Sequence, residues 1–131
     1  MKPERKLWHK IRNFMTDISF TRIENLSSSG TPDLLCCNKN GTFFTCELKV
    51  TQSNLVRLSP HQISFHVKHP VNTFILVSSE RDSTEKLYEG SRILPLVSEG
   101  LRLEACCLGL ESIYEKFKTL GAPKVLGELR A

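Results

Sequence analysis

Apolar side chains recur every three or four positions at the start of the chain, and this spacing predicts an amphipathic helix over residues 4–15. Its apolar stripe consists of Leu7, Trp8, Ile11, Phe14 and Met15. An extended stretch over 18–23 follows, and a polar loop at 27–30 leads to Pro32, a residue tolerated at the start of a strand. The chain is therefore expected to begin with a helix and an extended segment.

Two strand-like segments come next, over 34–37 and 43–50, and the turn sequence 38–41 joins them into a hairpin. A second helix is expected to start at Pro60, because Pro suits the first helical position and Ser59 has capping-box spacing to the Gln three residues later. A short apolar run within 72–79 then predicts a buried central strand.

The last third of the chain carries weaker patterns. They predict an edge strand at 86–88, a short helix over 91–99 interrupted by Pro95, and a strand over 101–107. A clear helical stripe over 110–120 follows, either as a helix that covers the core or as a subunit contact. The order helix, three strands, helix, strand predicts the α/β class, with a mixed central sheet flanked by helices.

Length and composition describe one ordinary globular domain. The chain has 131 residues, of which 40% are hydrophobic and 24% charged, and it is long enough for one core without cross-links. No apolar run approaches the ~20 residues that cross a bilayer, and the charged start leads into no signal-peptide core, so we expect a cytoplasmic protein without membrane contact. The five cysteines lack metal-site spacing and are expected to be reduced core residues.

The positive charge is concentrated in one half of the sequence. Residues 1–70 contain ten Lys or Arg and only five Asp or Glu, within a net charge of +4 for the whole chain. Such an excess is typical of a solvated surface and is also able to attract a polyanion such as a nucleic acid.

Candidate chemistry lies on the predicted hairpin. Side chains alternate along a strand, so Glu47 and Lys49 point to one face, expected to be exposed, and their apolar neighbours to the other. The turn decides whether Asp33 joins them. A two-residue turn pairs Asp33 with Leu48 on the wrong face, whereas a three-residue loop over 39–41 pairs Asp33 with Glu47.

The second register brings two carboxylates within about 5 Å, close enough to share a hard divalent ion. Mg²⁺ needs few protein oxygens, so Asp33, Glu47 and the Leu48 carbonyl suffice to hold it against a phosphate. Lys49 would then orient or help deprotonate the attacking water and offset charge on the phosphate. These parts suit hydrolysis of a phosphodiester.

The combined motifs resemble the PD-(D/E)xK nucleases, and within them the VRR-NUC branch. The motifs are Arg22-Ile23-Glu24-Asn25, Gly30-Thr31-Pro32-Asp33, Glu47-Leu48-Lys49, Leu58-Ser59-Pro60-His61-Gln62 and Leu87-Tyr88-Glu89-Gly90. The resemblance implies a restriction-endonuclease-like fold and Mg²⁺- or Mn²⁺-dependent DNA cleavage by a single nuclease domain over 1–131, with its core at about 4–90 and an extension over 91–131. Small stand-alone members, typical of phages and bacteria, are similar to Holliday junction resolvases and act as homodimers.

The resemblance also implies residue roles. Asp33 and Glu47 match the metal carboxylates, Lys49 the active-site lysine, and Gln62 the glutamine behind the site. A third carboxylate remains open between Glu4, on the first helix, and Glu24, which is included among the catalytic candidates.

Further residues carry two interpretations each. Gln62 either only completes the capping box or reaches the metal-bound water or the scissile phosphate. The candidates for nucleic-acid binding are Arg22, Ser29, His61 and Lys68. Their alternatives are an ion pair with Glu24 for the arginine and ordinary surface positions for the others, and the remaining helix histidines, His66 and His69, are also taken as surface residues.

The expected function is a metal-dependent endodeoxyribonuclease that prefers branched DNA such as a four-way junction. A small chain reads two strands most easily as a symmetric pair, which favours a homodimer. Two alternatives stay open: a nuclease for flaps, nicks or a specific sequence, and a DNA-binding module that has kept the fold without catalysis.

Overall fold

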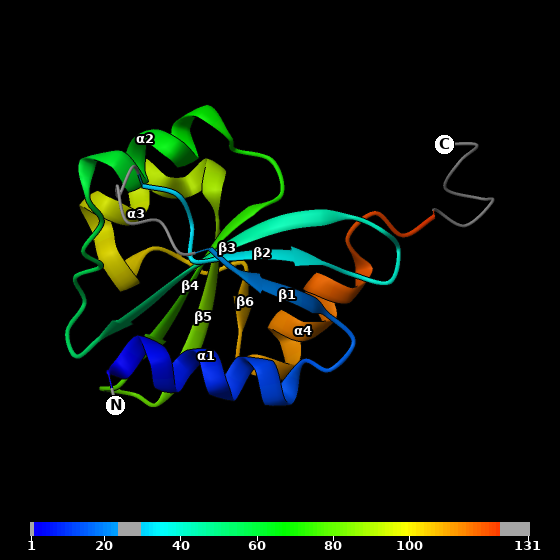
Figure 1. Ribbon diagram of the computed structural model, residues 1–131. Coiled ribbons are helices and arrows are strands. Elements are labelled where there is room, and N and C mark those ends of the chain that lie inside the picture. The colour runs from blue at the N-terminus through cyan, green and yellow to red at the C-terminus, as the bar shows by residue number, and fades with distance from the viewer. Residues whose placement is uncertain (1, 24–29, 124–131) are drawn as a thin grey trace.

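The computed structural model describes residues 2–23 and 30–123, and these form a six-stranded mixed sheet with helices on both faces (Figure 1). The helices are α1 (Pro3–Phe14), α2 (Pro60–Lys68), α3 (Ile93–Glu99) and α4 (Leu110–Thr119). The strands are β1 (Ser19–Arg22), β2 (Leu34–Cys37), β3 (Phe43–Thr51), β4 (Thr73–Ser79), β5 (Thr84–Glu89) and β6 (Cys107–Leu108). The α/β class is confirmed, as is the predicted order of elements through β4.

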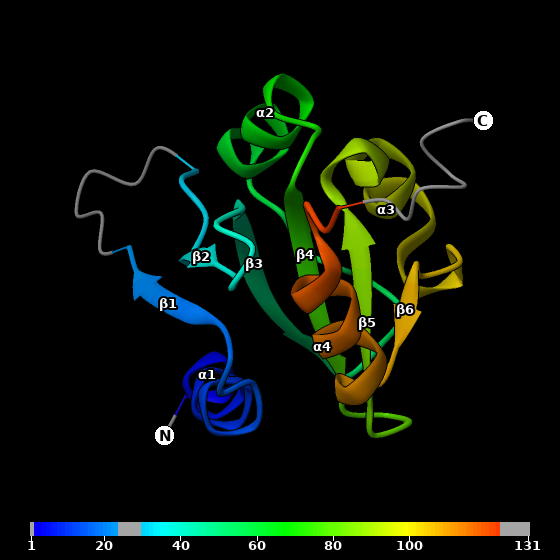
Figure 2. The same ribbon diagram turned by 90° about the vertical axis from the view of Figure 1, so that its right-hand side faces the viewer.

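The strands lie in sequence order from β1 to β6, as Figure 2 shows. Only β3 and β4 run parallel, because α2 carries the chain across one face of the sheet between them; the other neighbours are antiparallel. Within the described part of the chain no helix has the length and apolar character to span a membrane.

Each face of the sheet has its own core. On the face of α1 and α4, the apolar side of β3 packs with side chains of both helices, including Trp8, Ile11 and Phe117. On the face of α2 and α3, Ile75 and Val77 of β4 pack with residues such as Leu96. Ile113 and Phe117 of α4 are fully buried, so the core-covering alternative for this helix is confirmed.

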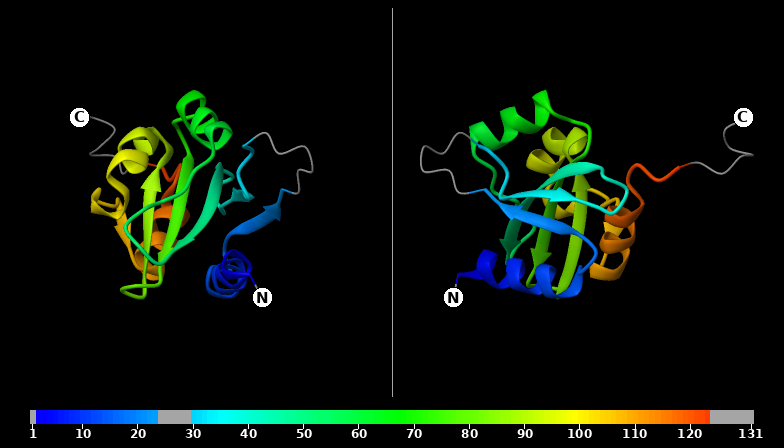
Figure 3. Two further views of the ribbon diagram at one scale, coloured as in Figure 1. Left: turned by 90° about the vertical axis from the view of Figure 1, so that its left-hand side faces the viewer. Right: turned by 45° about the vertical axis from the view of Figure 1, so that its right-hand side comes forward.

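The β2–β3 hairpin has the three-residue loop that the sequence allowed. Leu34 lies opposite Cys46, the backbone amide of Asn38 donates to the Thr42 carbonyl at 3.2 Å, and Gly41 has a φ of +78°. A left-handed glycine at this position completes the bulged three-residue turn. The tip reaches the C-terminal end of α4, where the two elements lie side by side (Figures 1 and 3).

The strand predicted at 86–88 is confirmed within β5, but its edge position and the strand predicted over 101–107 are wrong. β5 is no edge strand, because β6 pairs with it on the side away from β4. The strand predicted over 101–107 is instead a single 3₁₀ turn at Gly100–Arg102 and a short connection into β6. Leu101 and Leu103 are buried in the core on the α3 side of the sheet but do not pair with another strand. Their alternating apolar pattern therefore results from burial of these side chains and not from strand pairing.

Two local predictions also need correction. Pro95 does not interrupt α3, because it lies in the first turn, where its missing N–H has no helical acceptor to lose. The cysteines are all free, and Cys36 and Cys46 are buried as expected, but Cys106 is exposed. Cys106 lies just before the short β6, and this placement leaves its side chain outside both cores.

Candidate active site

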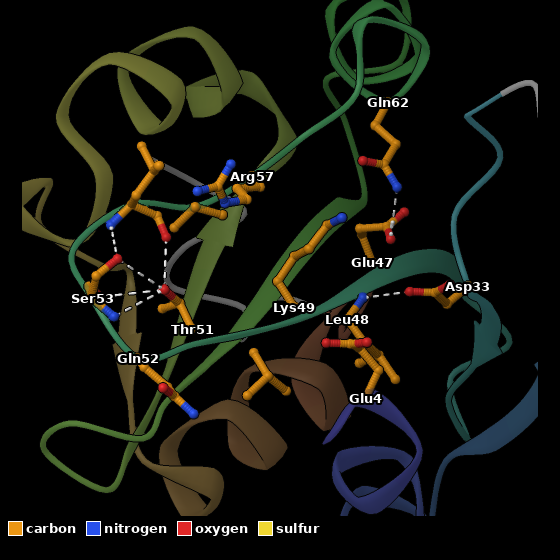
Figure 4. A pocket seen from close by; sticks show the side chains of 13 residues that line it. Glu4, Asp33, Glu47, Leu48, Lys49, Thr51, Gln52, Ser53, Arg57 and Gln62 are labelled. Carbon is orange, nitrogen blue, oxygen red and sulfur yellow. Dashed lines mark hydrogen bonds between the residues drawn. The ribbon is translucent and has the colours of Figure 1, made fainter. Parts of the chain in front are cut away.

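A pocket of about 650 Å³ opens at the end of the hairpin opposite its turn (Figure 4). Its charged and amide side chains come from α1, the residue before β2, β3, the segment between β3 and α2, and α2 itself. They are Glu4, Asp33, Glu47, Lys49, Gln52, Arg57 and Gln62. Six residues named from the sequence are therefore brought together: Glu4, Asp33, Glu47, Leu48, Lys49 and Gln62. We call this space the carboxylate pocket.

Asp33 is held directly before the first residue of β2. The register of the hairpin, continued by one residue, places it opposite Glu47, as the three-residue loop requires. Its Oδ2 accepts a hydrogen bond from the backbone amide of Leu48 at 2.8 Å. Because both backbone groups of a strand residue point to the same edge, the Leu48 carbonyl also faces the Asp33 side and not β4.

The approach to Asp33 depends on a glycine. Gly30 has a φ of +79°, and a Cβ at this position would lie 2.3 Å from the backbone carbonyl carbon of His61. Only glycine allows the chain to pass this close to the first turn of α2. The contact fixes the segment that ends in Asp33 against the helix that carries Gln62.

Glu47 is buried, with 2% of its surface exposed, so the predicted exposed face is wrong. The crossover through α2 covers this face of β3, which local alternation in the sequence does not reveal. Glu47 Oε2 accepts a hydrogen bond from Gln62 Nε2 at 3.2 Å, while Oε1 is buried without a partner among the described residues. Burial, followed by the neighbouring Asp33 charge, raises the pKa of Glu47 well above its ordinary value, and the Lys49 charge opposes this shift.

Gln62 completes the predicted capping box and also contacts Glu47, while its contact with a metal-bound water or a phosphate stays a prediction. Its side-chain Oε1 accepts from the backbone amide of Ser59 at 2.9 Å, and its backbone amide donates to the Ser59 hydroxyl at 3.1 Å. These two bonds complete the capping box. Because a backbone donor occupies Oε1, the NH₂ end must point the other way, toward Glu47. The helix cap therefore also fixes the orientation of the amide in the pocket.

Two cationic side chains border the carboxylates. In Figure 4 the Lys49 side chain extends toward Glu47, and Arg57 lies on the other side of Lys49 from Glu4. Neither Lys49 nor Arg57 forms an ion pair with a residue in the described ranges. Sequence reasoning missed Arg57; the available signal was a basic residue in the segment between the Glu-x-Lys strand and the Ser-Pro-x-Gln helix start.

The third carboxylate at the pocket is Glu4. It projects from the first turn of α1, lines the pocket, and its charge adds to the rise in the pKa of Glu47. The other candidate, Glu24, lies outside the described residues, as does Ser29.

The remaining candidates lie away from the carboxylate pocket. Arg22 lines a neighbouring pocket, while His61 and Lys68 are exposed on α2 and do not line the carboxylate pocket. The surface assignment of His66 is wrong. It is fully buried, with Nδ1 2.8 Å from the Gln62 carbonyl oxygen, and burial lowers its pKa. His66 lies in the last turn of the short helix α2, and its position in the sequence did not indicate that its ring faces the protein interior.

The donors fit a hard divalent cation. Two carboxylates and a strand-edge carbonyl are all oxygen ligands, and the buried, unpartnered Oε1 of Glu47 is left for a ligand to satisfy. Within the described ranges no group of three or more His, Cys, Asp or Glu residues converges as a metal site. The fit is therefore to an ion such as Mg²⁺, which keeps several waters, and not to a site enclosed by protein ligands.

No protein-family model matches this chain, and no curated protein matches it. The resemblance to the VRR-NUC branch therefore stays a prediction from the motifs. The function has to be inferred from the residues of the pocket themselves.

Proposed function

We propose that the chain is a divalent-metal-dependent endonuclease that hydrolyses phosphodiesters in DNA. One observation carries the proposal: the hairpin register brings Asp33, Glu47 and Lys49 to one pocket, where a buried oxygen of Glu47 has no partner within 2–23 and 30–123. Two acids and an amine at the mouth of an open pocket suit the handling of an anionic ester and a water nucleophile.

In this proposal Asp33, Glu47 and the Leu48 carbonyl hold Mg²⁺ or Mn²⁺. The bound ion supplies Lewis-acid activation of the phosphate and of the attacking water. The Asp33 carboxylate is kept in position by the Leu48 amide, and the Glu47 carboxylate by the Gln62 amide. Both acids thus meet the cation in fixed orientations, with little reorganisation on binding.

The cationic side chains act on the phosphate. Lys49 orients the attacking water and offsets the negative charge that grows on the phosphoryl oxygens. Arg57, exposed at the pocket wall, offers a guanidinium to a phosphate of the same backbone. Neither side chain has to break an ion pair with a described residue before it binds the substrate.

We assign the fold to the restriction-endonuclease-like group and the chain to the VRR-NUC branch of the PD-(D/E)xK nucleases. The support is the element order from α1 to β4, with one acid directly before β2, the other on β3, and the glutamine on the crossover helix. As substrate we propose branched DNA such as a four-way junction, cut by a symmetric pair of chains in the cytoplasm of a bacterium or a phage-infected cell.

The proposal is tested with purified chain, a labelled four-way junction, and flap and linear duplexes of matched sequence. We expect cleavage in Mg²⁺ or Mn²⁺, none with chelator, and the fastest cutting of the junction. Faster cutting of flaps or of one linear sequence would support phosphodiester hydrolysis but contradict the proposed preference for four-way junctions. Tight DNA binding without cleavage in any divalent ion would instead identify a non-catalytic binding module.

A further inference from the structure

A second pocket, of about 570 Å³, adjoins the carboxylate pocket at the first turn of α1. Lys2, Arg5 and Arg22 line it together with Glu4, which lines the carboxylate pocket as well. The two spaces therefore meet at Glu4. We call the second space the basic pocket.

The charges of the basic pocket are not balanced. Its lining has three cationic side chains and one carboxylate, and none of the three cations forms an ion pair with any residue in 2–23 or 30–123. Glu4 is shared with the carboxylate pocket, so it does not neutralise this lining alone. An open pocket with this excess of cationic side chains among the described residues fits an anionic ligand.

Arg22 is partly held in place before any ligand binds. Its guanidinium carbon lies 6.0 Å from the centre of the Trp8 ring, and Trp8 in turn packs edge-on against Phe20 at 5.4 Å. A guanidinium over an aromatic face gains cation–π stabilisation and loses less freedom when it binds an anion.

Cationic side chains thus stand on both sides of the carboxylates. Lys49 and Arg57 line the carboxylate pocket, and Arg57 lies on the other side of Lys49 from Glu4 (Figure 4). Glu4 is the residue that the basic pocket shares, so the cations of that pocket border the carboxylates at the Glu4 end. A site for the end of a strand needs phosphate contacts on one side only. Contacts on both sides suit a backbone that continues past the site in both directions.

We propose that the basic pocket holds a backbone phosphate of an uninterrupted DNA strand that crosses the carboxylate pocket from Arg57 to Arg5 and Arg22. The choice of DNA as the ligand rests on the proposed function; the path along the surface rests on the charges alone. The strand needs no free end, because both directions away from the carboxylates are open and lined by cations.

The test compares two sets of charge removals on the full chain, in chelator so that binding is measured without cleavage. The double variant Arg5→Gln/Arg22→Gln removes two charges of the basic pocket and keeps a side-chain stem at position 22 against Trp8. The matched control is Arg12→Gln, because Arg12 also lies over Trp8, at 5.6 Å, but lines neither pocket. The readout is fluorescence anisotropy with a short labelled duplex across a series of KCl concentrations.

We expect the double variant to bind at least about tenfold more weakly at low salt and to reduce the slope of log affinity against log salt by about 2, one per lost phosphate contact. Arg12→Gln should leave the slope unchanged, and closed circular duplex should compete as well as linear duplex per base pair. An unchanged slope in the double variant, an equal loss with Arg12→Gln, or failure of the circle to compete would each overturn the path.

The inference and the proposed function fail separately. A reduced slope in a chain that cuts no DNA keeps the binding path and rejects the nuclease. Metal-dependent cleavage by the parent, together with an unchanged salt slope in the double variant, would support the nuclease function and reject the proposed path of the strand. Because both variants carry surface substitutions, their melting temperatures should match that of the parent. If the double variant does not fold, Arg5→Gln alone should reduce the slope of log affinity against log salt by about 1. An unchanged slope in Arg5→Gln would overturn the proposed path of the strand.

Discussion

The two ends of the β2–β3 hairpin treat buried polar groups in opposite ways. At the tip, Asn38 is 5% exposed and its side-chain amide donates to the carbonyl oxygens of Phe117 at 2.9 Å and Leu120 at 2.7 Å. Its Oδ1 accepts from the backbone amides of Asn40 and Thr42. These contacts close the turn and satisfy carbonyls at the end of α4.

The other end leaves comparable groups unsatisfied. Glu47 is as buried as Asn38, yet its Oε1 has no partner among the described residues, and Asp33 lies close enough to raise its pKa. Lys49 stands nearby without an ion pair in the described part of the chain. The tip is built for stability, whereas the open end has a stability cost that a bound cation and phosphate would relieve.

The largest difference between the two ends should appear in cleavage. We predict that Asp33→Asn and Lys49→Ala each lower the single-turnover rate at fixed Mg²⁺ by at least about 100-fold, because each removes a group that acts on the cation or the phosphate. Asn at position 33 still accepts from the Leu48 amide, so the hairpin should stay intact. DNA affinity should change little for Asp33→Asn. Parent-like rates in both variants would locate the chemistry elsewhere.

The next effect is on stability, and it belongs to the tip. Asn38→Ala removes two bonds to the C-terminal end of α4 and two to the turn, and it removes the side-chain donor of the buried Phe117 carbonyl; the Leu120 carbonyl keeps the Asn40 amide. We predict a loss of about 2–4 kcal/mol in the free energy of unfolding, measured in urea. At a temperature where the variant is folded, its cleavage rate should match the parent. A selective loss of rate in a stable protein would mean that the two ends are not independent.

The order of elements and the hairpin register were predictable because both depend on local signals. Gly41 needs a left-handed conformation, the loop length fixes which residues face each other, and Ser59 with Pro60 marks the start of α2. These signals limited Asp33 to two registers, and the left-handed Gly41 of the three-residue loop selects the one opposite Glu47. The same locality explains why the capping role of Gln62 was foreseen.

What the sequence did not reveal depends on long-range packing. The burial of Glu47 follows from the crossover of α2 over its strand, and that of His66 from the closing of α2 onto β4 and Gly90. The placement of Glu4 at the pocket depends on where α1 docks beneath the sheet. Arg57 lies in a connecting segment with no periodicity of its own, so its convergence with Lys49 becomes visible only in three dimensions.

A smaller change should separate the two roles of Gln62. Gln62→Leu removes both the bond to Glu47 and the acceptor for the Ser59 amide, and we predict that it lowers the cleavage rate by about 10-fold and raises the Mg²⁺ concentration needed for half-maximal rate. Ser59→Ala keeps the acceptor contact and loses only the hydroxyl, so it should cost about 1 kcal/mol of stability with a near-parental rate. Equal rate losses in both variants would reduce Gln62 to a helix cap.

The smallest effect concerns stability against pH without divalent cations. The pKa of Glu47 is raised in the folded chain, so the folded state holds the Glu47 proton more tightly than the unfolded state. The resulting contribution to the free energy of unfolding is fully present below pH 4.5 and is lost as the pH rises through the folded pKa. Glu47→Gln stays neutral and should melt a few degrees higher than the parent at pH 8, a gain of about 1 kcal/mol.

The same pair of proteins contains an internal control. The lowered pKa of His66 makes both of them lose stability as the pH falls through 6.5, so this contribution cancels in the difference. Saturating Mg²⁺ should raise the melting temperature of the parent more than that of Glu47→Gln. If the parent and Glu47→Gln melt in parallel at every pH, Glu47 is not held in an unfavourable site.

The central claim is that a divalent cation binds at the open end of the hairpin and not at its tip. Paramagnetic Mn²⁺, added in substoichiometric steps, broadens the NMR signals of nearby amide protons, and the chain carries a probe at each end: the Gln62 side-chain amide with the Leu48 backbone amide, and the Asn38 side-chain amide. We predict that the Gln62 and Leu48 signals broaden first, that the Asn38 signal stays sharp, and that Asp33→Asn abolishes the effect. Equal broadening at both ends, or none at Gln62 and Leu48, would contradict the proposed site.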